Sequence, residues 1–181
     1  MILTLEKYTS DEHKKLKKLY IDAFPAEERA PFFLIMSKAK KGRAEMLTAH
    51  DGNEFVGFAY MVCYKDLAYL FYLAVDKDKR GMGYGRKIVE AVKSRYRGKR
   101  IFLAREQIDK SAENYEQRVS RRNFYIRCGF KDLPCHIKEA SVFYDVMGIG
   151  GKISADEYEA LITAWAGKLI RLLVDMRIIE K

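Results

Sequence analysis

Cysteine and histidine are scarce in this sequence. The three cysteines, Cys63, Cys128 and Cys135, form an odd set without a CxxC pair, so they indicate neither a disulfide framework nor a zinc knuckle. The three histidines are scattered and lack the spacing of a metal site. We therefore predict no metal and a reducing, cytoplasmic environment.

Long hydrophobic runs are also missing. The longest apolar stretch, residues 67–75, is too short to span a bilayer, and the N-terminal segment has no apolar signal-peptide core. We expect a protein that is neither exported nor membrane-spanning. A chain of 181 residues, 49% of them hydrophobic, can bury one core but hardly two. The prediction is one domain over residues 1–147 with an extension over residues 148–181.

The charge is strongly positive, with a formal net value of +9. Such a charge suits nucleic acid, a membrane surface or a small polyanion such as a nucleotide cofactor. The basic residues are spread along the whole chain and form neither a tail nor an RNA-binding motif. Nucleic acid is therefore not favoured as a partner.

Hydrophobic periodicity predicts an α+β fold. The expected strands cover residues 2–7, 45–50, 55–64, 69–75, 100–104 and 142–147. A first helix follows a capping box of Thr9 and Glu12 and ends near Pro25, and further helices cover residues 88–96 and 114–128. Asp51-Gly52-Asn53 supplies a hairpin turn. This order predicts a largely antiparallel sheet.

The last segment reads as an amphipathic helix. Ser154 and Glu157 form a second capping box, and an apolar stripe at helical spacing follows it. The stripe comprises Tyr158, Leu161, Ile162, Trp165, Leu169, Leu172 and Leu173. We expect this helix to pack on the domain or on a second subunit, which would make a homodimer. A membrane-surface helix is disfavoured because both faces carry acids.

A glycine-rich segment, Arg80-Gly81-Met82-Gly83-Tyr84-Gly85, lies between a predicted strand and a predicted helix. Backbone N–H groups at a helix start bind phosphate, aided by the helix dipole. The segment is no Walker A loop, because no Gly-Lys-Ser/Thr ends it, and no GxGxxG loop, because Arg86 replaces the last glycine. A plain tight turn with a solvated basic face, which would include Lys87, is the alternative.

The segment resembles the coenzyme A loop of the GNAT superfamily of N-acetyltransferases, whose pattern is Arg/Gln-x-x-Gly-x-Gly/Ala after a strand ending in Ala-Val. Tyr125, Gly129 and Phe130 are similar to the Tyr-x-x-x-Gly-Phe signature of the same family. The resemblance covers residues 1–147. It implies a GNAT-like mixed, mostly antiparallel central sheet flanked by helices, to which this chain adds the C-terminal amphipathic helix.

The resemblance implies an activity and a set of cofactor-binding residues. The activity is direct transfer of an acetyl group from the co-substrate acetyl-CoA to an amine of a small-molecule or peptide acceptor. A catalytically silent acyl-CoA-binding module and a basic nucleic-acid-binding protein are the alternatives. The pyrophosphate would lie on the loop amides and the pantetheine arm along the preceding strand. The residues so implied are Leu73, Ala74, Val75, Arg80, Gly81, Met82, Gly83, Tyr84, Gly85 and Arg86.

Two residues are expected to transfer protons. Tyr125 matches the family's tyrosine, whose hydroxyl protonates the departing thiolate; a core aromatic residue is the alternative. Glu106 follows a predicted strand and is the first choice for the base, since burial can raise the pKa of a carboxyl group. The alternatives are a surface glutamate and a base that acts through water.

Three further residues are expected near the acceptor. Glu27 and Glu28 follow Pro25 in the region that overhangs the acceptor pocket in the family, or they begin the second helix, where acids suit the dipole. Arg118 lies on or beside the helix face of Tyr125, together with Arg121 and Arg122. These arginines bind an acidic acceptor or the cofactor, or they form a solvated basic face.

Overall fold

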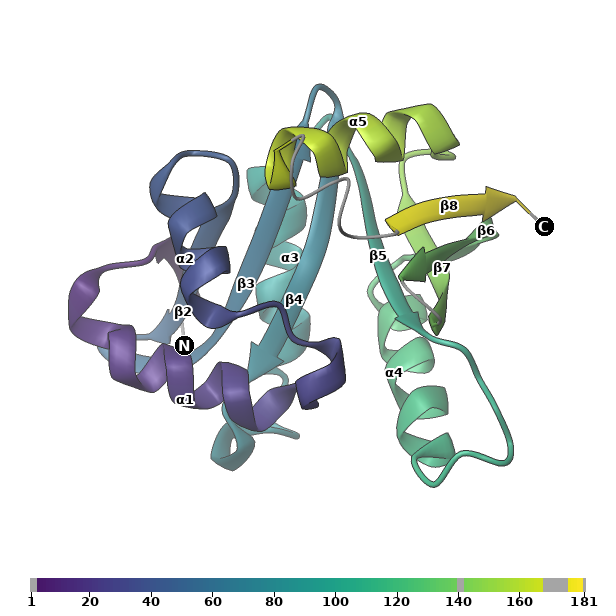
Figure 1. Cartoon of the computed structure of the whole chain (residues 1–181). Helices are drawn as coiled ribbons and strands as arrows, with labels where there is room; N and C mark the ends of the chain where they lie inside the picture. The colour runs from purple at the N-terminus through teal and green to yellow at the C-terminus, as the bar shows by residue number, and fades with distance from the viewer. Residues whose placement is uncertain (1–2, 140–141, 168–175, 181) are drawn as a thin grey trace. The chain divides into compact units, whose positions relative to one another are not determined.

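A computed structural model describes residues 3–139, 142–167 and 176–180. The fold is α+β, as expected, and the chain divides into two compact units (Figure 1). The first unit comprises Met1–Val62 and Leu70–Arg97, and the second comprises Cys63–Tyr69 and Gly98–Lys181. None of the described helices is long and apolar enough to cross a bilayer.

The first unit is a sheet with helices on both faces (Figure 1). Its strand order is β1-β2-β3-β4, and both β1–β2 and β2–β3 pair antiparallel. The strands are β1 (Leu3–Lys7), β2 (Glu45–Asp51), β3 (Glu54–Tyr64) and β4 (Leu67–Val75). The helices are η1 (Ser10–Glu12), α1 (His13–Ala23), η2 (Ala26–Glu28), α2 (Phe32–Lys40), η3 (Lys77–Lys79) and α3 (Tyr84–Arg95).

Strand β3 is buried on both faces. On one face the ring centroid of Phe58 lies 6.3 Å from that of Tyr20 in α1. On the other face Gly57 lies so close to β4 that an added Cβ would come within 2.4 Å of the Ala74 carbonyl oxygen and 3.1 Å of Ile88 in α3. Only glycine permits this approach, which brings β3 and α3 up against the end of β4.

The second unit begins with the first residues of β4, which pair in parallel with β5 (Arg100–Glu106). The strand order continues β5-β7-β6-β8 with antiparallel pairing, where β6 is Lys131–Glu139, β7 is Val142–Ile149 and β8 is Met176–Glu180. The helices are α4 (Tyr115–Arg127) and α5 (Ala155–Ala166).

Helix α5 packs its apolar stripe within the second unit. Tyr158 is fully buried, and its ring centroid lies 6.2 Å from Tyr69 and 6.3 Å from Phe102, which stack on each other at 4.5 Å. Trp165 is 4% exposed. The predicted capping box of Ser154 and Glu157 is present. Leu169, Leu172 and Leu173 lie outside the described residues.

Four details differ from the sequence-based expectations. Thr9 makes no side-chain cap, and the Glu12 carboxylate lies 2.5 Å from Nε2 of His50. Helix α2 begins at Phe32 after Pro31, so Glu27 and Glu28 belong to η2 and do not start it. Helix α5 ends at Gly167, whose φ is 85°, and the strands β6 and β8 had no counterpart in the expectations.

Candidate active site

The glycine-rich segment is a turn that leads from β4 into α3. Asp76 donates its backbone N–H to Val56 at 2.9 Å, and its side chain accepts from the amide of Asp78 at 3.0 Å. Gly83 is the N-cap of α3, and the first helical bond runs from Lys87 to Gly83 at 3.2 Å. The amides before Lys87 therefore lie in the first turn, where a helix has no acceptor for its own N–H groups.

Gly81 and Gly83 have φ angles of 79° and 82°. Nothing lies within 4 Å of a Cβ added at either position. The backbone conformation, and not the lack of space, is what requires glycine here. The same open space lets an anion approach the first-turn amides, which fits a phosphate site at the positive end of the helix dipole.

The side chains of the turn have different roles. Arg80 is exposed and donates from Nε to the Val75 carbonyl at 3.3 Å, while Met82 is 62% exposed. Tyr84 is buried, and its hydroxyl donates to the Asp51 carboxylate at 2.7 Å, a bond that raises the pKa of Tyr84. Tyr84 thus anchors α3 to the β2–β3 turn, whereas Arg86 is exposed.

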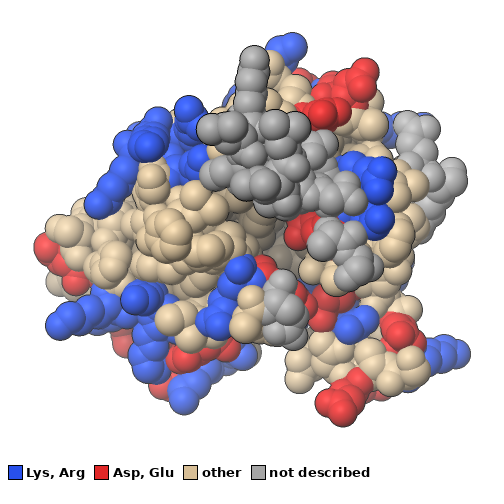
Figure 2. All heavy atoms as spheres, in the orientation of Figure 1, with Lys and Arg blue, Asp and Glu red and all other residues tan. Residues whose placement is uncertain are grey.

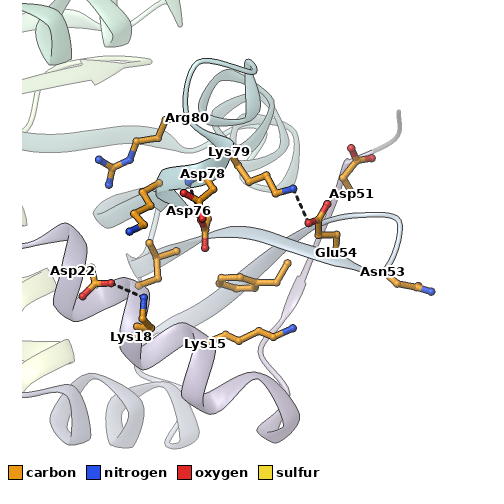
Figure 3. A pocket seen from close by; sticks show the side chains of 13 residues that line it. Lys15, Lys18, Asp22, Asp51, Asn53, Glu54, Asp76, Asp78, Lys79 and Arg80 are labelled. Atoms are coloured by element: carbon orange, nitrogen blue, oxygen red, sulfur yellow. Dashed lines mark hydrogen bonds and ion pairs between the residues drawn. The ribbon is translucent and has the colours of Figure 1, made fainter.

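A cavity of about 870 Å³ adjoins the turn on the side of α1 (Figure 3). Two ion pairs lie in its lining: Lys79 pairs with Glu54 at 2.6 Å, and Lys18 pairs with Asp22 at 3.1 Å. It is lined by Lys15, Lys18, Leu19, Asp22, Asp51, Asn53, Glu54, Phe55, Asp76, Lys77, Asp78, Lys79 and Arg80. Its bases and acids are equal in number, so it has no net attraction for phosphate. The phosphate-site assignment therefore depends on the first-turn amides.

Charged groups of both signs also lie side by side around α1 on the molecular surface (Figure 2). Lys and Arg side chains alternate there with Asp and Glu side chains and do not merge into one basic patch. The net positive charge is thus locally balanced on this part of the first unit.

In the second unit, Glu106 ends β5 and is only 9% exposed. Its Oε1 accepts from Nδ2 of Asn114 at 2.8 Å, and its Oε2 accepts from Arg121. Arg118 lies 3.5 Å from Oε1 and donates to Asn114 at 2.6 Å and to the Gln107 carbonyl at 2.8 Å. The carboxylate is therefore held in one position by groups from the start and the middle of α4.

Tyr125 lies in the last turn of α4 and is also 9% exposed. Its ring contacts Phe124 and Phe130, with centroids 5.0 Å and 5.6 Å away. Gly129, with φ of 91°, ends the helix and lets Phe130 donate to the Tyr125 carbonyl at 3.0 Å. Burial raises the pKa of Tyr125 to about 12, with Arg121 opposing the effect. The environment of Tyr125 therefore disfavours the tyrosinate anion.

A second cluster of charges, which the sequence analysis missed, joins α4 to the strands of this unit. Arg105 is 5% exposed and lies 3.1 Å from the Asp132 carboxylate and 3.0 Å from Asp145. Arg122 pairs with Asp132 at 2.5 Å, and His136 lies 3.0 Å from Asp145. The helix arginines thus pair with carboxylates of the chain itself. No periodic signal links Arg122 to Asp132, because the partners lie on different elements.

Glu28 lies in η2 of the first unit, where its carbonyl accepts from the Tyr72 hydroxyl at 3.3 Å. Its neighbour Glu27 has no described side chain. The first unit holds the glycine-rich turn, residues 73–75 and Glu28, whereas the second unit holds Glu106, Arg118 and Tyr125. No group of three or more His, Cys, Asp or Glu within the described ranges is placed to hold a metal ion.

Comparison with known proteins identifies the family. A model described as an acetyltransferase (GNAT) domain matches residues 42–132, half of the chain, including the glycine-rich turn and Tyr125. No curated protein matches the sequence.

Solved structures share the fold at low identity. A Bacteroides thetaiotaomicron protein assigned to the GNAT family is 21% identical, with a TM-score of 0.71 over 87% of this chain and 92% of its own. An aminoglycoside 6'-N-acetyltransferase complexed with coenzyme A is 16% identical, with a TM-score of 0.63 over 85% of this chain and 100% of its own. A variant of a Vibrio cholerae spermidine N-acetyltransferase is 15% identical, with a TM-score of 0.63 over 81% and 92%. The chain belongs to the GNAT family of acetyltransferases.

Proposed function

We propose that the protein transfers the acetyl group of acetyl-CoA directly to an amine. The observation that carries this proposal is the turn before α3, in which Gly81 and Gly83 take positive φ angles beside open space. That geometry leaves room for the pyrophosphate of coenzyme A to approach the amides of the first turn. The backbone of Leu73, Ala74 and Val75 would pair with the pantetheine arm, and Arg80 and Arg86 would add forked hydrogen bonds to phosphate.

The proposed chemistry needs two proton transfers. The amine nitrogen attacks the acetyl carbonyl carbon, a C–N bond forms, and the C–S bond breaks with its electron pair passing to sulfur. Tyr125 donates its hydroxyl proton to the departing thiolate, and its place within residues 42–132, which the acetyltransferase domain model matches, supports this role. Glu106 accepts the proton that the amine loses; its oxygens, bonded to Asn114 and Arg121, can each accept one further hydrogen bond.

The proposed acceptor is a cationic amine. Aminoglycosides and spermidine, which appear in the names of two acetyltransferases of similar fold, are such amines. Glu27 and Glu28 are proposed to attract such amines by their negative charge, and Arg118 is proposed to bind the acceptor. No disulfide joins the three cysteines, all of which lie in the described part of the chain, and we propose that the protein works in the reducing cytoplasm.

A panel of acceptors tests the proposal. Purified protein is incubated with acetyl-CoA and spermidine, an aminoglycoside or a lysine-containing peptide, and free thiol is measured. We expect thiol release and acetylated product with at least one amine, and none when the same amine is acetylated beforehand. Tight binding of acetyl-CoA without thiol release for any acceptor would favour a silent acyl-CoA-binding module.

A further inference from the structure

Tyrosine hydroxyls hold the connection between α1 and α2 in the first unit. The Tyr20 hydroxyl donates to the carbonyl of Ala30 at 2.8 Å. The Ala30 amide in turn donates to the Tyr72 hydroxyl at 3.0 Å. Both backbone polar groups of Ala30 are therefore bonded to tyrosine side chains, one from α1 and one from β4.

Tyr72 makes a second bond to the same connection. Its hydroxyl lies 3.3 Å from the carbonyl of Glu28, to which it donates. One hydroxyl thus accepts from residue 30 and donates to residue 28, which fixes the backbone between them. Arg29 adds a bond from its guanidinium to the Ile21 carbonyl at 3.1 Å. The connection has no regular secondary structure after η2, so these bonds replace the ladder that a helix or strand would provide.

The two tyrosines are themselves held rigidly. Tyr20 is 1% exposed and Tyr72 is 5% exposed, and their rings meet edge to face with centroids 5.1 Å apart. Phe24, which begins the connection, packs on Tyr72 with a centroid distance of 4.9 Å. Burial, followed by the neighbouring Tyr72, raises the pKa of Tyr20, so its hydroxyl remains a donor. A buried donor or acceptor that loses its partner costs more than the bond itself contributes.

Tyr72 stands directly before residues 73–75 in β4. We propose that Tyr72 is a positioning residue. Its hydroxyl fixes residues 28–30 against β4, the strand whose residues 73–75 would pair with the cofactor, and so sets the affinity for the acceptor. The effect on the acceptor rests on the proposed function, in which Glu28 attracts the amine. The hydroxyl touches no reacting atom, so its removal leaves the chemical step intact.

The test compares Tyr72→Phe with a matched control, Tyr60→Phe. Tyr60 is also a buried tyrosine of this unit, but its hydroxyl donates to the Ile35 carbonyl in α2 and not to the connection. Two quantities are measured: hydrogen exchange of the Ala30 amide by NMR, and steady-state kinetics with the amine found in the acceptor panel. Loss of neutral hydrogen bonds should change an equilibrium by about fivefold to tenfold.

For Tyr72→Phe we expect Ala30 to exchange at least about fivefold faster and the acceptor KM to rise by about fivefold to tenfold. The kcat and the Kd for acetyl-CoA should stay within about twofold of the parent. Tyr60→Phe should leave Ala30 exchange and the acceptor KM unchanged. Tyr20→Phe, which removes the other bond to Ala30, should reproduce the faster exchange.

Unchanged Ala30 exchange in Tyr72→Phe would overturn the proposal. Faster exchange with an unchanged acceptor KM would overturn the claim that fixing residues 28–30 sets the affinity for the acceptor. A parent protein that acetylates no amine would count against the proposed function alone, because the exchange measurement needs no activity and still decides whether Tyr72 holds residues 28–30.

Discussion

Tyr125 and Glu106 are buried to the same extent, at 9% exposure, but their surroundings differ in kind. Aromatic rings pack around Tyr125, and the loss of water raises its pKa. Polar groups of α4 surround Glu106 and bond both of its oxygens. The apolar environment thus disfavours the charged form of Tyr125, whereas arginine compensates the negative charge of Glu106.

Tyr125→Phe should lower kcat by about a hundredfold and leave the Kd for acetyl-CoA unchanged, because general acid catalysis contributes about that much. The phenyl ring keeps the contacts with Phe124 and Phe130, so packing is preserved. The control is Tyr115→Phe at the start of the same helix, which should retain full activity. Steady-state kinetics and titration calorimetry would measure both effects. Equal kcat for Tyr125→Phe and the parent would leave Tyr125 as a packing residue.

Glu106→Gln should remove the low-pH limb from the profile of kcat/KM, since the amide cannot accept the proton of the amine. The substitution also removes the ion pair with Arg121, so a second variant separates the two effects. Arg121→Gln loses the ion pair but keeps the carboxylate and should keep the limb. A low-pH limb that survives in Glu106→Gln would assign the base to another group or to water.

At the scale of elements, Arg100 joins three segments of the second unit. It begins β5, and its guanidinium bonds the Asp66 carboxylate at 2.7 Å, the Glu157 carboxylate at 2.5 Å and the Lys152 carbonyl at 2.6 Å. Glu157 also closes the capping box of α5 by accepting from the Ser154 amide at 2.9 Å. The same carboxylate therefore starts the helix and fastens it to the sheet.

Glu157→Gln should make the free energy of unfolding less dependent on pH in the acidic range. The hydrogen bond from Arg100, followed by that from the Ser154 backbone, lowers the pKa of Glu157 to about 2. A lowered pKa stabilises the fold above the ordinary value of 4.5, and this contribution is lost as the pH falls toward 2. Because the side chain is 39% exposed, we expect only about 1 kcal/mol at pH near 7.

Urea unfolding near pH 7 and near pH 3 measures this contribution. The difference in free energy of unfolding between the parent and Glu157→Gln should shrink at the lower pH. Asp156→Asn in the same helical turn is the control, since Asp156 is exposed and should show little difference at either pH. A difference of equal size at both pH values would mean that the charge on Glu157 contributes nothing.

The elements that the sequence predicted well are those with local signals. Gly83 and the apolar spacing of Ile88, Val89 and Val92 suffice to predict α3, and Ser154 with Glu157 suffices to start α5. Strand β6 was missed because Pro134 interrupts it, and its register shifts between Asp132 and His136. The strand forms because it pairs with β7 and β8, which its own sequence does not reveal. The capping box at Thr9 did not form, and a distant partner, His50, contacts the carboxylate of Glu12.

At the scale of the whole molecule, the candidate site also has some residues that a local sequence motif predicts and others that none predicts. The turn at residues 80–86 and Tyr125 each lie in a short sequence motif, so the family could be predicted from sequence. The pairing of Arg122 with Asp132 and the bonds of Tyr72 to residues 28 and 30 join segments far apart in the chain. Such contacts depend on tertiary packing, and no local pattern encodes them.

The central claim, that the turn before α3 binds acetyl-CoA through its backbone, is tested by thermal unfolding with and without the cofactor. At a hundredfold excess over Kd, acetyl-CoA should stabilise the parent by about 2.7 kcal/mol, or roughly 5–10 °C in Tm. Gly83→Val should lose this shift, because valine strains a backbone with φ of 82° and displaces the amides.

Gly98→Val is the matched control for that measurement. Gly98 has a φ of 87° and equally open surroundings, but it follows the other end of α3. Both variants should unfold at a lower temperature than the parent, by similar amounts, when no cofactor is present. With acetyl-CoA, the account predicts that Gly98→Val recovers the full shift of the parent and that Gly83→Val recovers none. A full shift in Gly83→Val would contradict it.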